Sequence, residues 1–189
     1  DMVVCGGDTS PGYPPLEGEK INQYVLDMMG GFTAEKMWVS NGRLTGFIPK
    51  TGLKYIKDGI SEGCGFVDFS GHGNTNVWAT HPEDEHIWVP TPSGVISSSD
   101  IAQLSNGNKL PIVIVGACST FKFNKDPDCF GWSFLLNNNG GGIAACGASG
   151  LDWFYLGEYV TEKGFEKLCI DTFQAYKDGA MTFGEMWSG

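Results

Sequence analysis

The 189-residue sequence is poor in basic residues, with 12 lysines and arginines against 22 aspartates and glutamates and a net charge of −10. Nucleic-acid affinity depends on cationic contacts with phosphates, so this acidic chain is not expected to bind a nucleic acid as its main partner. Basic peptides fit its charge better. No apolar run approaches the ~20 residues of a membrane-spanning helix. The start has no signal-peptide pattern and leads straight into a strand-like run, so we expect Asp1 to be a cut or processed end.

The cysteines lack both a CxxC pair and the dense spacing of a disulfide framework. The six are Cys5, Cys64, Cys118, Cys129, Cys146 and Cys169. Several lie in apolar runs, where a free cysteine behaves as a small buried hydrophobe. The cysteine pattern therefore gives no evidence for disulfides, leaves the disulfide state open and does not identify a redox compartment.

Strand-like and helix-like segments alternate along the chain, without internal repeats. With 41% hydrophobic residues the chain can bury one good core, which predicts a single domain. Strands are expected at 2–5, 36–40 and 143–146 and in the runs before His72 and Cys118, and helices at 17–29, 51–61, 100–104, 130–136 and 157–176. The long polar segment 74–99 is expected to be a loop. This alternation predicts an α/β fold whose mostly parallel sheet has helices on both faces.

His72 and Cys118 each follow an apolar run, so both are expected at the carboxyl ends of strands, where open α/β sheets hold their ligands. A thiol needs a base to become a thiolate at neutral pH, and a nearby imidazole supplies one. Taken singly, a buried structural cysteine and a hydrogen-bonded structural histidine would be the better interpretations. Their joint placement favours a nucleophile pair.

The residues around this pair resemble a known family of peptidases. Residues 69–74 contain His72-Gly73 after one strand, residues 110–118 end in Ala117-Cys118 after the next, and Cys129-Phe130 follows. This arrangement resembles the gingipain family of cysteine peptidases, in the caspase/gingipain clan, over nearly the whole chain. The resemblance implies a caspase-like three-layer α/β sandwich. It also implies that residues 1–189 are one catalytic domain of a longer protein with further domains.

The same resemblance assigns roles to individual residues. Cys118 would be the nucleophile, His72 the general base and acid, and the backbone N–H groups of Gly73 and Cys118 the oxyanion hole. Asp8 occupies the position of an acid that orients the histidine in relatives. Aspartate is shorter than the usual glutamate, so a water could intervene, and a turn-forming role for Asp8 is the alternative.

Substrate selection is assigned in the same way. Glu19 matches the acid that pairs with the residue before the scissile bond (P1) in arginine-preferring relatives, with Glu17 as the second choice. Both acids could instead stabilise the helix that they begin, through their interaction with the helix dipole. Trp153 matches a tryptophan that lines the same pocket, or is an ordinary half-buried aromatic, and the neighbouring Asp152 is a candidate second acid.

Metal sites are weakly indicated. The chemistry implied by the resemblance needs no cofactor, although relatives use structural Ca²⁺, for which Asp126 and Asp128 are candidate ligands. His81 and His86 flank acidic residues, but their spacing matches no common ligand pattern and favours a solvated loop. Trp78 and Trp88, in the same segment, either line the substrate cleft or pack the segment against the rest of the protein.

The predicted function is hydrolysis of peptides or proteins after a basic residue. Two alternatives stay open, which are a catalytically silent caspase-like interaction module and a metal-dependent hydrolase. The second requires a third and fourth ligand that the sequence does not obviously offer. The resemblance alone implies an extracellular or cell-surface location.

Overall fold

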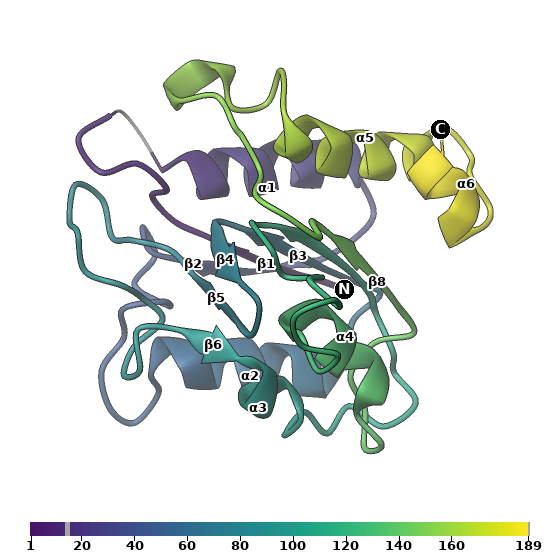
Figure 1. Ribbon diagram of the computed structural model, residues 1–189, viewed down its shortest axis with the longest axis horizontal. Helices are drawn as coiled ribbons and strands as arrows, with labels where there is room; N and C mark the ends of the chain where they lie inside the picture. Colours follow the sequence, from purple (N-terminus) through teal and green to yellow (C-terminus); the bar gives the residue numbers. More distant parts are fainter. Residues whose placement is uncertain (14–15, 189) are drawn as a thin grey trace.

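The apolar runs predicted as strands form a five-stranded parallel sheet at the centre of the molecule (Figure 1). The computed structural model describes residues 1–13 and 16–188. The strands, in spatial order β2-β1-β3-β7-β8, are β2 (Ala34–Trp38), β1 (Met2–Gly6), β3 (Phe66–Ser70), β7 (Ile112–Gly116) and β8 (Ala144–Gly147). The predicted α/β class with a mostly parallel sheet is confirmed.

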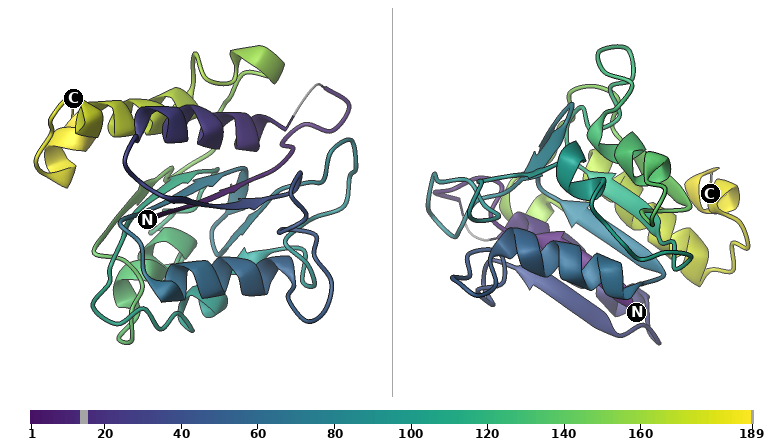
Figure 2. Two further views of the ribbon diagram at one scale, coloured as in Figure 1. Left: turned by 180° about the vertical axis from the view of Figure 1, so that it is seen from behind. Right: turned by 90° about the horizontal axis from the view of Figure 1, so that it is seen from below.

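Helices cover both faces of the sheet and make it the middle of three layers (Figures 1 and 2). One face carries α1 (Glu17–Met28), α5 (Phe165–Lys177) and α6 (Phe183–Ser188). The other carries α2 (Gly52–Glu62), α3 (Ser98–Ile101) and α4 (Phe130–Leu136). None of the helices in the described residues is long and apolar enough to cross a membrane.

The central strand β3 is buried along its whole length, as expected for a parallel sheet covered on both sides. Val67 and Phe69 belong to the core beneath α2, α3 and α4, whereas Phe66 belongs to the core beneath α1 and α5. Phe69 is fully buried, and truncating such a phenylalanine to alanine costs about 3–5 kcal/mol. Packing against a core on each face keeps β3, the strand that leads to His72, rigid.

The segment 74–99 is not the continuous loop that its composition predicted. A small antiparallel sheet forms from β4 (His72–Asn74), β5 (Val77–Ala79) and β6 (Ile96–Ser97). His72 pairs with Ala79 across β4 and β5, and Trp78 pairs with Ile96 across β5 and β6. These strands have two or three residues each, which is too short for a clear alternating pattern. His72 therefore begins a strand, and pairing with β5 fixes its backbone.

The last long helix begins later than the sequence predicted. Gly157 to Tyr159 form only a short 3₁₀ turn, η1, and α5 starts at Phe165. Gly164 has a φ of 80°, and a Cβ on it would lie 2.3 Å from the carbonyl oxygen of Trp153. Only glycine tolerates this combination, so the chain makes a turn at Gly164 before the helix can start.

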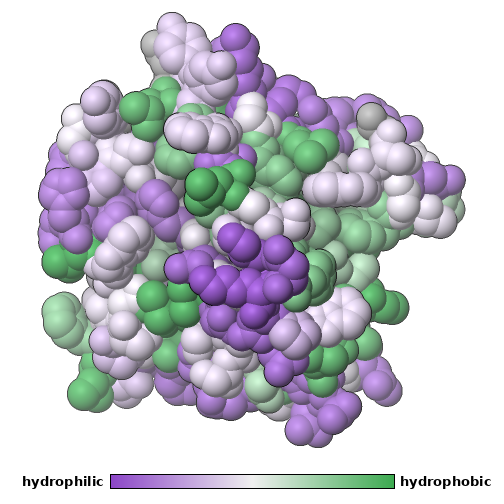
Figure 3. All heavy atoms as spheres, viewed as in Figure 1, coloured by the Kyte–Doolittle hydropathy of each residue, from purple (hydrophilic) through white to green (hydrophobic). Residues whose placement is uncertain are grey.

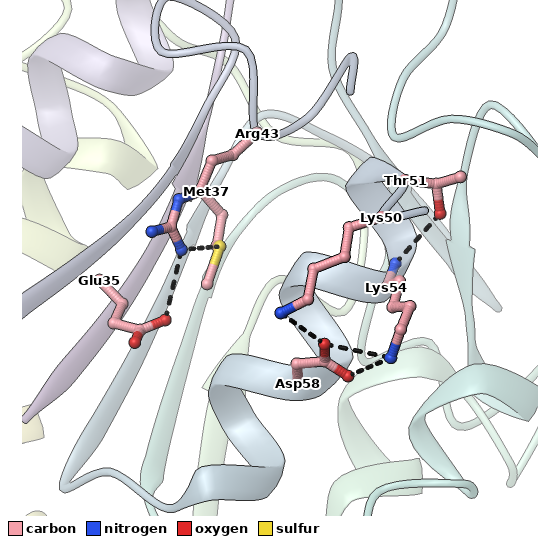
Figure 4. A network of polar contacts seen from close by, with 7 residues as sticks. All are labelled: Glu35, Met37, Arg43, Lys50, Thr51, Lys54 and Asp58. Carbon is pink, nitrogen blue, oxygen red and sulfur yellow. Dashed lines mark hydrogen bonds and ion pairs between the residues drawn. The ribbon is translucent and has the colours of Figure 1, made fainter. Parts of the chain in front are cut away.

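Charged groups form small clusters on the surface. Lys50 and Lys54 both reach Asp58 of α2, at 3.1 and 2.8 Å (Figure 4). All three side chains are partly exposed, so each pair contributes about 0–1 kcal/mol. On the face seen in Figure 3, hydrophilic and hydrophobic residues are interspersed over short distances.

Candidate active site

The two reactive residues lie at the carboxyl ends of neighbouring strands. Ser70 of β3 is paired in register with Gly116 of β7, and His72 and Cys118 each follow two residues later. The N–H of Gly71 donates to the carbonyl oxygen of Gly116 at 3.0 Å, so the two strand ends stay joined beyond the last paired residues. The sheet topology thus brings His72 and Cys118 to one edge, as the sequence predicted.

Gly73 makes the close approach between these two strand ends possible. A Cβ at this position would lie 2.5 Å from the carbonyl oxygen of Cys118 and 2.6 Å from Cγ2 of Thr120. Any side chain would push the strand after His72 away from the segment that carries Cys118. Within residues 1–13 and 16–188, the N–H of Cys118 donates to no backbone or side-chain acceptor. This N–H therefore has no protein partner at a strand end where an oxyanion would need a donor.

One backbone carbonyl fixes the orientation and tautomer of His72. Its Nε2 lies 2.7 Å from the carbonyl oxygen of Thr9. A carbonyl oxygen can only accept, so Nε2 must carry a proton and donate it. In the neutral ring Nδ1 is then the basic nitrogen.

Thr9 is itself held by a buried carboxylate. Oε2 of Glu17 accepts hydrogen bonds from the N–H of Thr9 at 3.1 Å and from its hydroxyl at 3.0 Å. Oε1 of the same carboxylate accepts from the N–H of Gly157 at 3.4 Å. Glu17 is fully buried in the first turn of α1. Glu17 and Thr9 thus form a relay to His72 that sequence reasoning did not find, since it considered Glu17 as a pocket acid or as a partner of the helix dipole.

Aromatic rings surround the His72 imidazole. Trp88 stands perpendicular to it at a centroid distance of 5.3 Å, His81 lies at 5.5 Å and Phe154 at 6.4 Å. Burial lowers the pKa of His72 below its ordinary value. The Thr9 carbonyl opposes this effect, as do the nearby carboxylates of Glu17 and Asp8, whereas His81 adds to it.

His81 does not lie in a solvated loop, and that interpretation of the sequence is wrong for this residue. Its side chain is buried, and its Nδ1 donates to the carbonyl oxygen of Ile87 at 2.7 Å. The ring stacks on Trp88 at 3.9 Å with an angle of 33° between planes. His86 is exposed. His81 is held at this buried position by an isolated antiparallel bridge, in which its N–H and carbonyl pair with the backbone of Asp8.

The Cys118 thiol contacts the backbone of Asp152. The N–H of Asp152 donates to Sγ at 3.3 Å, and Sγ lies 3.6 Å from the carbonyl oxygen of the same residue. An N–H aimed at sulfur stabilises a thiolate, and a carbonyl beside it accepts from the thiol. Asp152 thus reaches the site through its main chain. Its carboxylate accepts from the N–H of Trp153 at 2.6 Å, and burial raises its pKa.

Asp8 is almost fully buried near His72 but makes its hydrogen bonds elsewhere. Its carboxylate accepts from the N–H of Ser10 at 2.8 Å and from that of Asp84 at 3.1 Å. No hydrogen bond joins Asp8 to His72 among the residues that the structure describes. Its charge still favours the imidazolium form of His72. Asp8 therefore acts in the turn before α1 and affects His72 through charge.

The substrate-pocket candidates differ widely in exposure. Glu19 is 6% exposed, and its carboxylate accepts from the N–H of Ser40 at 2.9 Å and from its hydroxyl at 2.5 Å. Burial raises the pKa of Glu19, and the bonds from Ser40 oppose that rise. Trp153 is 82% exposed, so its indole is open to solvent beside Asp152. Trp78 is fully buried against Phe69 and belongs to the core.

Asp126, one of the two candidate calcium ligands, already accepts two hydrogen bonds. Asp126 uses one carboxylate oxygen to accept from the N–H of Asp128 and the other to accept from Nδ2 of Asn76. Within residues 1–13 and 16–188, no group of three or more His, Cys, Asp or Glu side chains gathers in a way that could hold a metal ion. A structural Ca²⁺ at Asp126 and Asp128 stays a prediction of the family resemblance, because Ca²⁺ also takes backbone carbonyl oxygens as ligands.

A comparison with family models decides the classification, because the model of peptidase family C25 matches residues 1–188. The chain belongs to peptidase family C25. The resemblance to gingipains drawn from the His72-Gly73 and Ala117-Cys118 motifs is confirmed. No curated protein sequence matches this C25 chain.

Solved structures support the same fold. The C25 chain is similar to one described as "Crystal structure of the Arg specific cysteine proteinase gingipain R (RGPB)", with 16% identity and a TM-score of 0.65 over 98% of this chain and 39% of that one. It is also similar to a complex of the pro- and mature domains of RgpB from Porphyromonas gingivalis, with 15% identity and a TM-score of 0.66 over 98% and 40% of the two chains. A third, "Structure of Protease", has 19% identity and a TM-score of 0.53 over 76% and 28%. The caspase-like fold is confirmed, and the C25 chain spans well under half the length of these relatives.

Proposed function

We propose that this C25 chain is the catalytic domain of a cysteine endopeptidase in which Cys118 and His72 form the catalytic pair. One observation carries the proposal. The parallel register of β3 and β7 joins the two strand ends beside a histidine whose free basic nitrogen is set by Thr9. A cysteine and a correctly oriented imidazole are the components that thiol-dependent acyl transfer needs.

In the acylation step, Nδ1 of His72 takes the proton of the Cys118 thiol. The thiolate attacks the carbonyl carbon of the substrate, a C–S bond forms, and one electron pair of the C=O bond moves to oxygen. The N–H groups of Cys118 and Gly73 stabilise this oxyanion. The imidazolium then gives its proton to the leaving nitrogen, the C–N bond breaks, and a thioester remains on Cys118.

Deacylation reverses these roles. His72 takes a proton from water, the hydroxide oxygen attacks the thioester carbon, and the C–S bond breaks to release the acid. The departing thiolate receives the proton back from His72. Between turnovers the N–H of Asp152, 3.3 Å from Sγ, stabilises the thiolate. Thr9 holds the ring by the nitrogen that does not exchange protons.

We propose a basic P1 residue, with Glu19 and Asp152 as the acids that favour it and Trp153 as a wall for its side chain. Ser40, whose hydroxyl and N–H donate to Glu19, lines a cavity of about 630 Å³ together with Glu83 and Glu85. Glu19, Asp152 and Trp153 are not among its lining residues. A cluster of carboxylates around a cavity attracts a guanidinium or ammonium group. The Arg-specific neighbour is consistent with this preference, although it shares only 16% identity.

The proposed substrates are peptides or proteins, and further domains of a parent chain are proposed partners. An extracellular or cell-surface location follows from the family resemblance. A second candidate function is a silent interaction module. The observation that favours it is that Sγ of Cys118 bonds the backbone of Asp152, while no described hydrogen bond joins it to His72.

A peptide library varied at P1 tests the proposal. The assay uses the C25 chain with and without Ca²⁺, and Cys118→Ala as the matched inactive variant. Cleavage after Arg or Lys that is absent in Cys118→Ala supports the peptidase and its P1 preference. Cleavage after other residues keeps the pair and rejects the basic pocket. No cleavage under either condition favours the silent module.

A further inference from the structure

A pocket of about 300 Å³ opens beside His72. Its lining comes from β4, β5 and the segment between β5 and β6, and it does not include Glu19, Asp152 or Trp153. Its lining comprises His72, Gly73, Val77, Ala79, Trp88 and Val95, with Asn74 at its edge. Apart from the histidine and Asn74, the lining is apolar.

Strand alternation explains why apolar side chains share a face with the catalytic histidine. In the β4–β5 pair, His72 lies opposite Ala79 and Asn74 lies opposite Val77. Side chains alternate between the faces of a strand, so these four residues share one face. The remaining pair, Gly73 and Trp78, uses the other face, where Trp78 is fully buried against the core.

Trp88 forms a wall that is fixed before any substrate arrives. Its indole is 49% exposed, so one side is free, whereas its other side stacks on the buried His81 ring at 3.9 Å. The hydrogen bond from His81 to the carbonyl oxygen of Ile87 holds that ring in turn. A rigid aromatic wall half open to solvent suits an apolar ligand group, because little conformational entropy is lost on binding.

We propose that this pocket binds the side chain of the residue just after the scissile bond (P1′) and selects a large apolar one, such as leucine or phenylalanine. The inference rests on the proposed function. His72 protonates the leaving nitrogen, so the residue that carries this nitrogen must lie against His72 when the C–N bond breaks. His72 is also part of the pocket lining, so the P1′ side chain is the substrate group nearest to the pocket. The pocket candidates that the family resemblance supplies, Glu19, Asp152 and Trp153, concern only the P1 side.

The test compares quenched peptides that share one P1 residue and differ at P1′, with Leu, Ser or Asp in that position. We expect kcat/KM for the Leu peptide to exceed that for the Ser peptide about tenfold or more, the range in which apolar pockets discriminate. A second readout is acyl transfer from a peptide ester, in which leucinamide should capture the acyl-enzyme more efficiently than glycinamide. This readout reports the P1′ side alone.

Two variants change the pocket and one serves as control. Trp88→Ala removes the wall, and Val77→Thr keeps the shape of the lining but adds a hydroxyl, so one remains informative if the other fails to fold. Both should bring the Leu:Ser ratio toward one. Trp187→Ala truncates a tryptophan of similar exposure (37%) in α6, toward the edge at which the strands begin, and should keep the wild-type ratio (Figure 1).

The outcomes separate this inference from the proposed function. Equal kcat/KM for all P1′ residues in an active enzyme overturns the inference and leaves the peptidase intact. The same holds if Trp88→Ala and Val77→Thr change selectivity only for the residue before P1. Failure of the wild-type chain to cleave any peptide or ester overturns the proposed function, and this inference with it.

Discussion

The carbonyl oxygen of Thr9 lies 2.7 Å from Nε2 of His72 and joins the turn after β1 to the histidine after β3. Glu17 stabilises the position of Thr9 and hence this bond, because its carboxylate accepts hydrogen bonds from both the N–H and the hydroxyl of Thr9. The third hydrogen bond of Glu17, from Gly157, links the same carboxylate to the segment that follows Asp152. One buried acid thus supports the loops on both sides of the proposed catalytic pair.

Replacement of this acid, Glu17→Gln, should lower kcat/KM about tenfold, equivalent to about 1.4 kcal/mol of transition-state free energy. An amide nitrogen cannot accept the hydrogen bonds that Thr9 and Gly157 now donate to the carboxylate. The Glu17 charge also raises the pKa of His72, so its loss lowers that pKa further. His72 must be unprotonated to take the thiol proton, so the acid limb of the pH profile of kcat/KM should move to lower pH.

Asp100→Asn is the matched control for the Glu17 variant. Asp100 caps α3 by accepting from the N–H of Ser97 at 2.9 Å and does not affect the pKa of His72. Its loss should reduce stability and leave the pH profile in place. Thr9→Val, which lacks the hydroxyl, should reproduce part of the loss of activity seen in Glu17→Gln. Thr9→Ser, which keeps the hydroxyl, should retain the wild-type activity. An unmoved acid limb in Glu17→Gln would contradict the relay.

The six cysteines provide an internal comparison of thiol reactivity. Burial raises the pKa of Cys64 and Cys146 to about 12 and raises those of Cys5, Cys129 and Cys169 as well. Iodoacetamide at neutral pH should therefore alkylate Cys118 first, as measured by mass spectrometry of digested protein over time. In His72→Ala this alkylation should slow at least about tenfold, because the base is gone. Equal rates at Cys118 and Cys129 in the native protein would contradict an activated thiol.

A buried carboxylate makes the stability of the fold depend on pH. Burial raises the pKa of Asp68 to about 7, although its hydrogen bond from Asn22 opposes the rise. In the unfolded chain this pKa is about 3.9, so between about pH 4 and pH 7 the folded state binds more protons. The free energy of unfolding should therefore fall as pH rises through this window. Burial also raises the pKa of Glu166, which adds to the same trend.

Asp68→Asn isolates this effect. The variant should be more stable than the wild type by about 1–3 kcal/mol at pH 8 and nearly equal to it at pH 4, as measured by urea denaturation. An amide at this position retains an acceptor for Asn22 and carries no charge. If the variant were destabilised equally at both pH values, the network of Asn22 and Asp68 would be needed for packing and the pH argument would fail.

The role of Glu19 in substrate choice has its own test. Glu19→Gln should lower kcat/KM for Arg and Lys at P1 by about tenfold and leave uncharged P1 residues nearly unchanged, since only a cation gains from the charge. Ser40→Ala is the companion variant, because it removes the hydroxyl that binds Glu19. A uniform loss across all P1 residues in both variants would assign Glu19 a structural role.

Sequence reasoning succeeded for His72 and Cys118, whose positions depend only on where the preceding strand ends. The apolar runs before His72 and Cys118 were long enough to predict strands, and parallel pairing then required both residues at one edge. It failed at the short strands β4, β5 and β6, because two or three residues carry no measurable period.

The groups that touch the reactive atoms were largely beyond sequence analysis. The partner of His72 is a main-chain carbonyl of Thr9, and that of Cys118 is the main chain of Asp152. Backbone groups have no residue signature, so motifs cannot reveal them. The buried Glu17 had a signal, an acid at a helix start, which the helix dipole explained equally well.

The central claim is that Cys118 forms a covalent acyl intermediate with the help of His72. Acid quenching during turnover of a peptide ester, followed by mass spectrometry of the digested protein, measures this directly. The account predicts the acyl mass on the peptide that contains Cys118, none in Cys118→Ala, and at least about a hundredfold slower formation in His72→Ala. Turnover that persists in Cys118→Ala, or an acyl group found only on another residue, would contradict it.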